Sequence, residues 1–280
     1  MKIHTLTIVG VGLIGGSIGL AAKKRGLANR VVGVGRHQDS LERARTLGAI
    51  DSFSLDLTSA VRDADVVVFC TPVDQIADQV LAAAPCCAAG TLLTDAGSTK
   101  GQIIKAVEGR LPAGVTFVGS HPLAGSEKRG PEHAEANLFQ DRLTVITPTS
   151  RTEPAAVERT KAFWQALGSR VRLMTPEDHD RALALTSHVP HLLASALAGI
   201  LPPELNELTA TGFRDTTRVA AGDPGLWKAI CEHNSHAILN ALDSLTGRLD
   251  EFRNVLQTGD WSRLDSLLTQ AKKVRDALGS

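Results

Sequence analysis

Short apolar runs rich in β-branched residues alternate with longer helical patterns over the first 120 residues of the chain. Each run is nearly continuous in hydrophobic residues, as is typical of strands that helices cover on both faces. This alternation predicts βαβ units in a parallel sheet. The predicted strands are Leu6–Gly10, Arg30–Val34, Asp65–Cys70, Thr91–Thr94 and Thr116–Gly119, followed by Leu143–Ile146 and Val171–Leu173 on either side of an amphipathic helix at Ala155–Leu167.

The pattern changes near Thr175, after which strand signals stop and helical periodicity continues. A chain of 280 residues is long enough for one large domain or two modest ones. We therefore predict an α/β Rossmann-type domain with a parallel sheet over residues 1–175, followed by an all-α dimerisation domain over residues 176–280.

The helical half contains a heptad seam. Apolar residues step by four and three from Ile238 to Leu256. Gly259 is expected to end this helix, and Asp260 to cap the next one. The seam is either core within its own domain or a ridge that packs against a second copy of the chain, which would give a homodimer.

The composition narrows the kind of ligand that this chain binds. Thirty Lys and Arg residues balance thirty Asp and Glu residues, so the chain lacks the positive charge that nucleic-acid binders and peripheral membrane proteins use. The four cysteines show no metal-ligand spacing, which predicts reduced thiols in a cytoplasmic protein. Glycines interrupt the apolar N-terminal stretch, and no later segment has the roughly 18 consecutive apolar residues that a membrane span needs. We therefore expect a small-molecule ligand and no nucleic-acid or membrane partner.

A glycine-rich segment stands between the first predicted strand and the first predicted helix. It reads Gly10-Val11-Gly12-Leu13-Ile14-Gly15 and matches the pattern GxGxxG. In this position the first glycine makes the turn, the second lets a pyrophosphate approach the backbone, and the third lets the helix pack on the strand. The free N–H groups of the helix N-terminus then face the anion. We predict a nicotinamide dinucleotide site here rather than a purely structural turn.

The end of the second predicted strand bears on the choice between NAD and NADP. An NAD site typically has Asp or Glu there, which accepts a hydrogen bond from the ribose 2′-hydroxyl. This sequence has Gly35 and Arg36 instead, so no carboxylate repels a 2′-phosphate and a guanidinium group is available to bind it. We expect NADP as the preferred cofactor and NAD as the alternative. In the competing interpretation, Arg36 is a solvated loop residue and Asp39 binds the ribose.

Polar residues follow three further predicted strands. Ligands of an open parallel sheet bind at the carboxyl ends of its strands. The segments at these ends are Cys70-Thr71-Pro72, Asp95-Ala96-Gly97-Ser98-Thr99-Lys100 and Ser120-His121-Pro122-Leu123-Ala124-Gly125. With the glycine-rich loop, they supply the candidate cofactor contacts, which are Gly10, Gly12, Leu13, Ile14, Gly15, Gly35, Arg36, Thr71, Pro72, Gly97 and Ser98.

His121 is the candidate general base. A dehydrogenase that oxidises an alcohol must remove the hydroxyl proton, and the ordinary pKa of histidine suits that task near neutral pH. A histidine at a strand end is often only a satisfied loop residue, but the neighbouring Ser98 segment favours the catalytic interpretation.

A second polar cluster lies in the predicted helical domain, at residues 187–191, 212–218 and 223–227. The histidine pairs His188/His191 and His233/His236 come without a matching carboxylate or cysteine motif, so no metal is expected. Arg214 and Arg218 are one helical turn apart, and an arginine near a nicotinamide site suits a substrate carboxylate. The alternative is a surface ion pair of either arginine with Asp215, which contributes little to stability.

Six motifs occur in order along nearly the whole chain. They are GxGLIGxS at Gly10–Ser17, CTP at Cys70–Pro72, DxxSxK at Asp95–Lys100, HPLAGSE at His121–Glu127, SHxPH at Ser187–His191 and GFRDTTRVAAGDP at Gly212–Pro224. Together they resemble the prephenate/arogenate (cyclohexadienyl) dehydrogenases of tyrosine biosynthesis. The first two motifs are shared with many Rossmann enzymes, whereas the last two are specific to this family.

The resemblance implies a dinucleotide domain, a helical dimerisation domain, and the oxidative decarboxylation of a cyclohexadienol. It implies that His121 takes the proton of the C4 hydroxyl and that Ser98 orients both this hydroxyl and His121. His191 and Arg218 would hold substrate carboxylates. The remaining substrate-binding candidates are Arg214 and, at the mouth of the pocket, Ser126 and Glu127.

Three alternatives remain open at the level of sequence. His191 fits a carboxylate of prephenate, whereas Glu127 suits the ammonium group of arogenate, and we expect prephenate. Another NADP-linked oxidoreductase, of the β-hydroxyacid dehydrogenase or imine reductase kind, gives no reason for HPLAGSE and GFRDTTR. A non-enzymatic dinucleotide sensor or dimeric interaction protein would use the seam from Ile238 to Leu256 as its functional element, and a turnover assay separates it from an enzyme.

Overall fold

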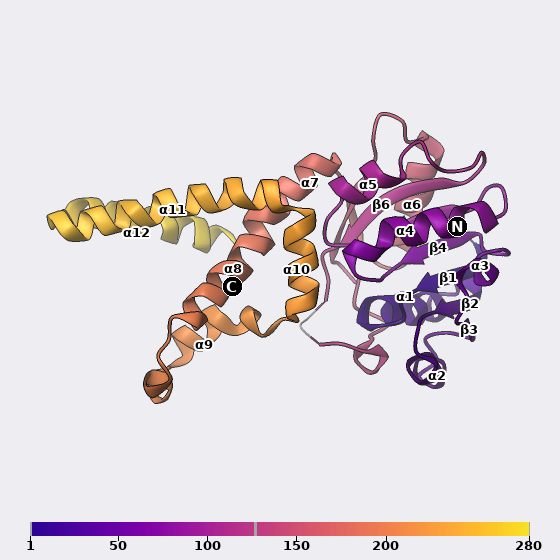
Figure 1. Cartoon of the computed structure of the whole chain (residues 1–280), viewed down its shortest axis with the longest axis horizontal. Coiled ribbons are helices and arrows are strands. Elements are labelled where there is room, and N and C mark those ends of the chain that lie inside the picture. The colour runs from indigo at the N-terminus through magenta and orange to yellow at the C-terminus, as the bar shows by residue number, and fades with distance from the viewer. Residues whose placement is uncertain (1, 126–127, 280) are drawn as a thin grey trace. The chain divides into compact units, whose positions relative to one another are not determined.

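The computed structural model describes residues 2–125 and 128–279 (Figure 1). The chain divides into two compact units, Met1–Ser235 and His236–Ser280.

One mixed sheet forms the centre of the first unit. The described residues give it eight strands in the order β3-β2-β1-β4-β5-β6-β7-β8. The strands are β1 (Ile3–Val9), β2 (Ala28–Val34), β3 (Ser52–Ser54), β4 (Val66–Phe69), β5 (Leu92–Asp95), β6 (Thr116–Pro122), β7 (Leu143–Thr147) and β8 (Arg170–Leu173). All seven predicted strands form, with ends shifted by a few residues. The short edge strand β3 was missed because its Ser-Phe-Ser sequence carries no apolar run.

The strand directions confirm the predicted parallel sheet and add one antiparallel pairing. Strands β1 to β6 are parallel, but β7 pairs antiparallel with β6, and β8 runs parallel to β7. A parallel partner needs a crossover connection of a dozen residues or more, usually a helix. In the described part of the connection from β6 to β7, the only helix is the short η2 (Pro131–His133), so the chain turns back on itself.

Helices cover both faces of this sheet (Figure 1). On one face, Ile18 of α1 (Leu13–Lys24) and Trp164 of α6 (Pro154–Ala166) pack against Ile8 of β1 in one hydrophobic core. On the other, Ile76 of α4 (Val73–Ala83) packs with Phe69 of β4 in a second core. This second core also includes residues of α5 (Gly101–Val107) and α10 (Pro224–His233). The smaller helices are α2 (Gln38–Thr46), α3 (Leu57–Ala60) and η1 (Ala84–Cys86).

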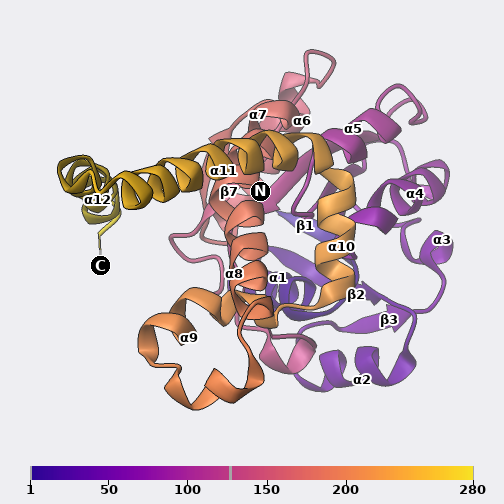
Figure 2. The same cartoon turned by 60° about the vertical axis from the view of Figure 1, so that its left-hand side comes forward.

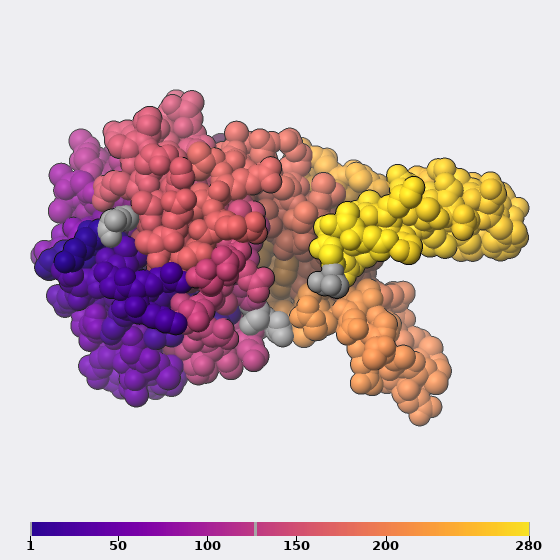
Figure 3. Space-filling model, turned by 180° about the vertical axis from the view of Figure 1, so that it is seen from behind, coloured from indigo at the N-terminus to yellow at the C-terminus, as the bar shows by residue number. Residues whose placement is uncertain are grey.

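The central strands β1, β4 and β5 are buried along nearly their whole length, which explains their nearly continuous apolar runs. The short helix η2 lies against α1, and Figure 3 shows these indigo and magenta segments on one face of the unit.

A run of helices completes the first unit. These are α7 (Pro176–Leu183), the π-helical turn η3 (Ala184–His188), α8 (Val189–Gly199), η4 (Pro203–Leu208), α9 (Thr211–Thr217), η5 (Arg218–Ala221) and α10. Helix α7 packs on α5, α8 packs on η5, and α10 packs on α4. The contacts of α7 and α10 with α5 and α4 hold this helical run at the sheet, and Figure 2 shows α8 and α10 joined through α9.

The second unit is a helical hairpin. Helix α11 (Ser235–Thr258) is followed by Gly259, whose φ is +68°. Helix α12 (Trp261–Ala277) begins after Asp260, whose carboxylate accepts a hydrogen bond from the Arg263 backbone N–H at 2.9 Å. These features confirm the predicted helix end and cap.

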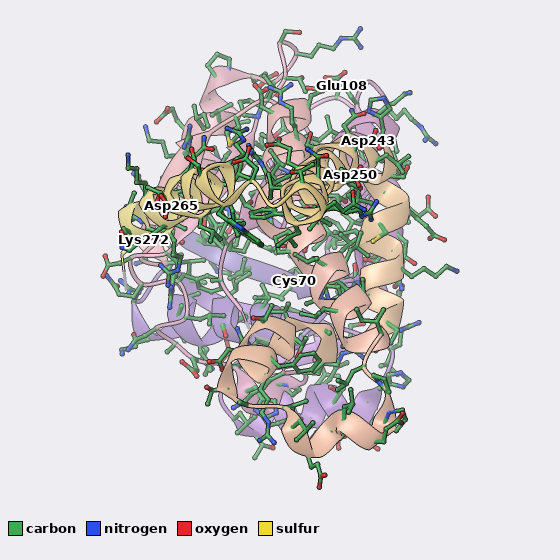
Figure 4. All side chains as sticks on the ribbon, turned by 90° about the vertical axis from the view of Figure 1, so that its left-hand side faces the viewer. Cys70, Glu108, Asp243, Asp250, Asp265 and Lys272 are labelled. Atoms are coloured by element: carbon green, nitrogen blue, oxygen red, sulfur yellow. The ribbon has the colours of Figure 1, made fainter. Side chains whose placement is uncertain are left out.

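Part of the predicted heptad seam is exposed in the single chain. Leu249 and Leu256 are 49% and 58% exposed. Helix α11 also carries the acidic side chains Asp243 and Asp250, each directly after a seam residue (Figure 4). No helix of the described residues is long and apolar enough to cross a membrane.

Candidate functional site

The glycine-rich loop links β1 to α1 in a conformation that only glycine tolerates at two points. Gly10 has a φ of +91°, and a Cβ atom there would lie 2.9 Å from the carbonyl carbon of Cys70. A Cβ atom at Gly15 would lie 2.1 Å from the carbonyl oxygen of Gly10. At Gly12, by contrast, a Cβ atom would meet nothing within 4 Å. The loop therefore packs tightly on the protein side and leaves open space at Gly12, which is the N-cap residue of α1.

This loop forms one wall of a cavity of about 540 Å³. The cavity collects the predicted cofactor residues Gly10, Gly12, Gly35, Arg36, Thr71 and Pro72 from the ends of β1, β2 and β4. Leu13, Ile14, Gly15, Gly97 and Ser98 are not among its lining residues. The lining also includes His37, Ser40 and Arg129, which sequence reasoning did not find. Asp39, the alternative ribose partner, lines a neighbouring cavity instead.

The electrostatics of this cavity suit an anion. The first turn of α1 carries no acidic residue, so no carboxylate competes for the free N–H groups of its N-terminus. Arg36 and Arg129 add two guanidinium groups to the lining, and Arg129 forms an ion pair with Asp223. Burial raises the pKa of Cys70, another lining residue, so its thiol stays protonated. The open space at Gly12 and the positive lining fit the pyrophosphate of a dinucleotide.

His121 lies within β6 rather than after it, because antiparallel pairing with β7 extends the strand to Pro122. Its Nδ1 atom is 2.9 Å from Nε2 of His179 in α7. The Nδ1 atom of His179 is in turn 2.8 Å from Oδ1 of Asp180. Burial lowers the pKa of both histidines, and the Lys100 ammonium group lowers both further. The two rings are therefore neutral near pH 7.

Asp180 connects this histidine pair to the neighbouring elements. Its carboxylate accepts hydrogen bonds from the backbone N–H groups of Lys100 and Gly101, both at 2.8 Å. Its backbone carbonyl accepts a hydrogen bond from Nδ2 of Asn234 at 2.8 Å. The residue thus joins the start of α5 to α7 and to the end of α10.

The segment after β5 is fixed by a buried ion pair. The ammonium group of Lys100 contacts the Asp95 carboxylate, and both side chains are fully buried. Lys100 also donates to the Ser120 carbonyl at 2.9 Å, while Asp95 accepts from the Ser120 and Gly97 N–H groups, each at 2.9 Å. Ser98 is half-buried within this segment. The pair therefore holds Ser98 and the strand that carries His121 at one corner of the sheet.

The second histidine cluster lies on η3 and α8. His191 stacks on Trp227 with ring centroids 3.5 Å apart and an interplanar angle of 11°. A Cβ atom at Gly222 would lie 2.5 Å from the indole nitrogen of Trp227 and 3.1 Å from Cε1 of His191, so only glycine leaves room for the stack. Burial lowers the pKa of His191, and a hydrogen bond to the Val219 carbonyl acts in the opposite direction.

Two buried nitrogens of this cluster find no hydrogen-bond partner among the described residues. They are Nε2 of His188 and Nδ1 of His191. The other side of the His188 ring, Nδ1, is 3.1 Å from Nδ2 of Asn234, and burial lowers the pKa of His188 to about 4. Unpartnered buried polar atoms of this kind are expected where a ligand or an ordered water binds.

The two predicted substrate arginines lie beside this cluster. Arg214 is in α9 and Arg218 begins η5, and both are exposed. Arg218 directly precedes Val219, whose carbonyl bonds to His191. Ser126 and Glu127, the remaining predicted substrate contacts, lie outside the described residues.

Among residues 2–125 and 128–279, no group of three or more His, Cys, Asp or Glu side chains is arranged to hold a metal ion. Sequence reasoning missed His179, Asp180 and Asn234 as parts of the site, and it quoted Lys100 only within the DxxSxK motif, without a role. The first two lie in the sequence Pro-Glu-Asp-His-Asp-Arg at the start of α7, where nothing in the spacing links them to His121.

Comparison with known proteins gives consistent matches over the whole chain. Residues 18–173 match the family model described as prephenate dehydrogenase, nucleotide-binding domain, and residues 175–270 match the prephenate dehydrogenase, dimerization domain. The chain is 36% identical to the cyclohexadienyl dehydrogenase of Zymomonas mobilis over 98% of this chain and 95% of that protein. It is 34% identical to the prephenate dehydrogenase of Bacillus subtilis, over 98% and 76% of the two chains.

The structure is similar to that of Aquifex aeolicus prephenate dehydrogenase solved with hydroxyphenyl propionate and NAD+. The TM-score is 0.93 at 28% identity, and the match covers 99% of both chains.

Proposed function

This chain belongs to the prephenate dehydrogenase family, and on that premise we propose that it converts prephenate to 4-hydroxyphenylpyruvate by NADP-dependent oxidative decarboxylation in tyrosine biosynthesis. The single observation that carries the proposal is the position of the half-buried His121. It stands at the carboxyl edge of the sheet, the edge at which the ends of β1, β2 and β4 form the dinucleotide cavity.

The reaction requires a proton acceptor and fixed reactants. A nicotinamide cofactor bound at the glycine-rich loop would supply the acceptor for the hydride that leaves C4 of the substrate. His121 takes the C4 hydroxyl proton on its Nε2 atom, and Ser98 orients the hydroxyl. The resulting ketone is vinylogous to the C1 carboxylate, so the C1–carboxylate bond breaks, carbon dioxide leaves, and the electron pair moves to the C4 oxygen as the ring becomes aromatic. This phenolate oxygen takes back the proton from His121. The protein therefore needs only to position the reactants and to accept and return one proton.

His191 and Arg218 hold the substrate carboxylates in this proposal. Arg218 offers a guanidinium group that suits a bidentate contact. His191 donates to the Val219 carbonyl, so its unpartnered Nδ1 carries a lone pair while the ring is neutral. A substrate carboxylate therefore binds at Nδ1 only when this nitrogen also takes up a proton. The protonated imidazole ring then stacks on the indole ring of Trp227. Arg214, Ser126 and Glu127 complete the set of proposed substrate contacts.

We propose a preference for NADP over NAD within the NAD(P)-dependent activity. Gly35 and Arg36 line the cavity where the second strand ends, and Asp39 does not line it. A carboxylate that would repel a 2′-phosphate is therefore absent from the described lining, and a guanidinium group is present. The glycine-loop residues Gly10 and Gly12 hold the pyrophosphate.

We also propose that the chain acts as a cytoplasmic homodimer with a domain boundary near residue 175. The two family matches meet between residues 173 and 175, and the second is to a dimerization domain. The exposed Leu249 and Leu256 of the seam are available to a second copy. The four cysteines are free thiols, as is usual in a reducing compartment.

Steady-state kinetics tests the function. We expect prephenate-dependent formation of NADPH, a higher kcat/KM for prephenate than for arogenate, and a higher kcat/KM with NADP than with NAD. Faster turnover of arogenate would reassign the substrate, with Glu127 as the partner of its ammonium group. Absence of turnover with all four combinations of substrate and cofactor would overturn the enzymatic assignment in favour of a dinucleotide sensor.

A further inference from the structure

We propose that His179 and Asp180 are positioning residues for His121, which fix its ring and its tautomer so that Nε2 presents a lone pair to the substrate. The inference rests on the proposed function, since it explains how the base of that reaction is prepared. It goes beyond that function because neither His179 nor Asp180 has a role in the steps given above.

The Asp180 carboxylate, when ionised, only accepts hydrogen bonds. Oδ1 receives the Lys100 N–H group and Oδ2 receives the Gly101 N–H group. The contact of 2.8 Å between Oδ1 and His179 Nδ1 therefore requires a proton on Nδ1. Because a neutral imidazole carries one N–H group, Nε2 of His179 has a lone pair.

The tautomer of His179 in turn determines the tautomer of His121. Nε2 of His179 lies 2.9 Å from Nδ1 of His121, and a hydrogen bond between them needs one donor. Since His179 accepts at Nε2, His121 donates from Nδ1. Neutral His121 then has its lone pair on Nε2, which is the form that a general base needs. An acceptor at Asp180 thus determines the proton position on His121 across two hydrogen bonds.

The packing around this chain of hydrogen bonds keeps it in place. His179 is 0% exposed, and it lies next to Asp180 in α7, whose N-cap Thr175 accepts from the Asp178 N–H group at 3.0 Å. His121 is held in β6 by pairing with Val145 of β7. Neither ring is therefore free to turn away from the other without breaking a buried contact.

The hydrogen bonds also bear on the charge that forms during the reaction. The substrate O–H bond breaks as the His121 Nε2–H bond forms, and the ring becomes an imidazolium ion that still donates through Nδ1. The Asp180 carboxylate is the negative group on the Nδ1 side of His121, and His179 connects the two. Lys100 and Asp95 face the pair from the segment after β5, and His188 faces it from η3. Lys100 opposes protonation of His121, whereas Asp180 favours the protonated state of the pair.

Nitrogen NMR of the whole protein reads the tautomer without relying on turnover. With ¹⁵N-labelled histidine, we expect His121 to show a protonated Nδ1 and an unprotonated Nε2 at pH 7.5, with its signals assigned by their loss in His121→Asn. The opposite tautomer, or rapid exchange between the two, would overturn the proposal. This result is obtained even from a protein that turns over neither prephenate nor arogenate, so it separates the two proposals.

Kinetics of three variants then measures the effect on the reaction. Asp180→Asn keeps an acceptor but removes the charge, and His179→Leu removes the acceptor for Nδ1. Loss of one hydrogen bond to a charged group corresponds to about a 10- to 150-fold fall in kcat, and we expect KM values to change little. His179→Gln, which retains an acceptor, should recover part of the loss. Asp178→Asn, on the same helix with a half-exposed side chain, is the matched control and should retain full kcat.

The pH profile separates positioning from a structural role. kcat/KM falls at low pH as His121 becomes protonated. Removing the Asp180 charge makes that protonation harder, so Asp180→Asn should move the midpoint of the acid limb to lower pH while the plateau falls. Folded Asp180→Asn and His179→Leu proteins with the parent's kcat and midpoint would refute the proposal. If neither variant folds, the NMR measurement on the parent decides alone.

Discussion

Replacing Arg36 by Ala tests how the cofactor cavity distinguishes a 2′-phosphate from a 2′-hydroxyl on the ribose. Arg36 lines this cavity beside Gly35 at the end of β2, and its side chain is exposed to solvent. A hydrogen bond to a charged group is worth about 1.5–3 kcal/mol. Because water screens an exposed guanidinium group, we expect the lower end of that range. A loss of about 1.5 kcal/mol weakens NADP binding about tenfold, while the Kd for NAD should stay nearly unchanged.

Calorimetric titration of each cofactor, together with the ratio of kcat/KM for NADP to that for NAD, measures this effect. Arg43→Ala is the matched control, because Arg43 is an exposed arginine of α2 that lines the neighbouring cavity and not this one. Arg43→Ala removes the same net charge as Arg36→Ala. A loss of NADP affinity that occurs only in Arg36→Ala therefore excludes a general electrostatic effect. kcat at saturating cofactor should be the same in all three proteins.

Gly35→Asp provides the reverse change. A Cβ atom at Gly35 would lie 3.3 Å from Cδ2 of the buried Leu41, so the substitution requires a shift of a few tenths of an ångström there. The new carboxylate repels a 2′-phosphate and accepts from a free 2′-hydroxyl, so the preference should shift toward NAD. A parent enzyme that already prefers NAD, or an Arg36→Ala protein with the parent's cofactor ratio, would refute this account of the loop.

Four further outcomes follow from the site. His121→Asn should lower kcat by roughly 10²–10⁴-fold with unchanged cofactor affinity, and near-normal kcat would remove His121 as the base. Burial and the Lys100 ammonium group hold the pKa of His121 well below 6.5. The parent's kcat/KM should therefore stay level as pH falls through 6.5 and decline only at lower pH. A decline centred at pH 6.5 would contradict the lowered pKa of His121. Arg218→Ala should raise the KM for prephenate far more than the KM for NADP, as kinetics at saturating cosubstrate will show. Leu249→Asp should give a monomer or an insoluble protein in sedimentation, since a charge in an apolar interface is costly; a parent that is monomeric at micromolar concentration would contradict the dimer.

Sequence by itself determined the features that depend on local patterns. The short apolar runs predicted seven of the eight strands of the described sheet. The signal is strongest in the central strands β1, β4 and β5, because a strand covered on both faces must be apolar nearly throughout. The glycine spacing defined the loop before α1, because positive φ at Gly10 and close packing at Gly15 are demands on single residues. Gly259 and Asp260 marked the helical hairpin for the same reason.

Only the tertiary structure decided which distant residues meet. The direction of β7 depends on the path of the chain after β6, and no periodicity within the strand records it. His179 lies 58 residues after His121 and reaches it only because α7 packs on α5 at the carboxyl edge of the sheet. A hydrogen bond between two such side chains leaves no repeat or spacing in the sequence, whereas helices and strands do. The candidate base was therefore predictable from its residue type and motif, but the orientation of its ring was not.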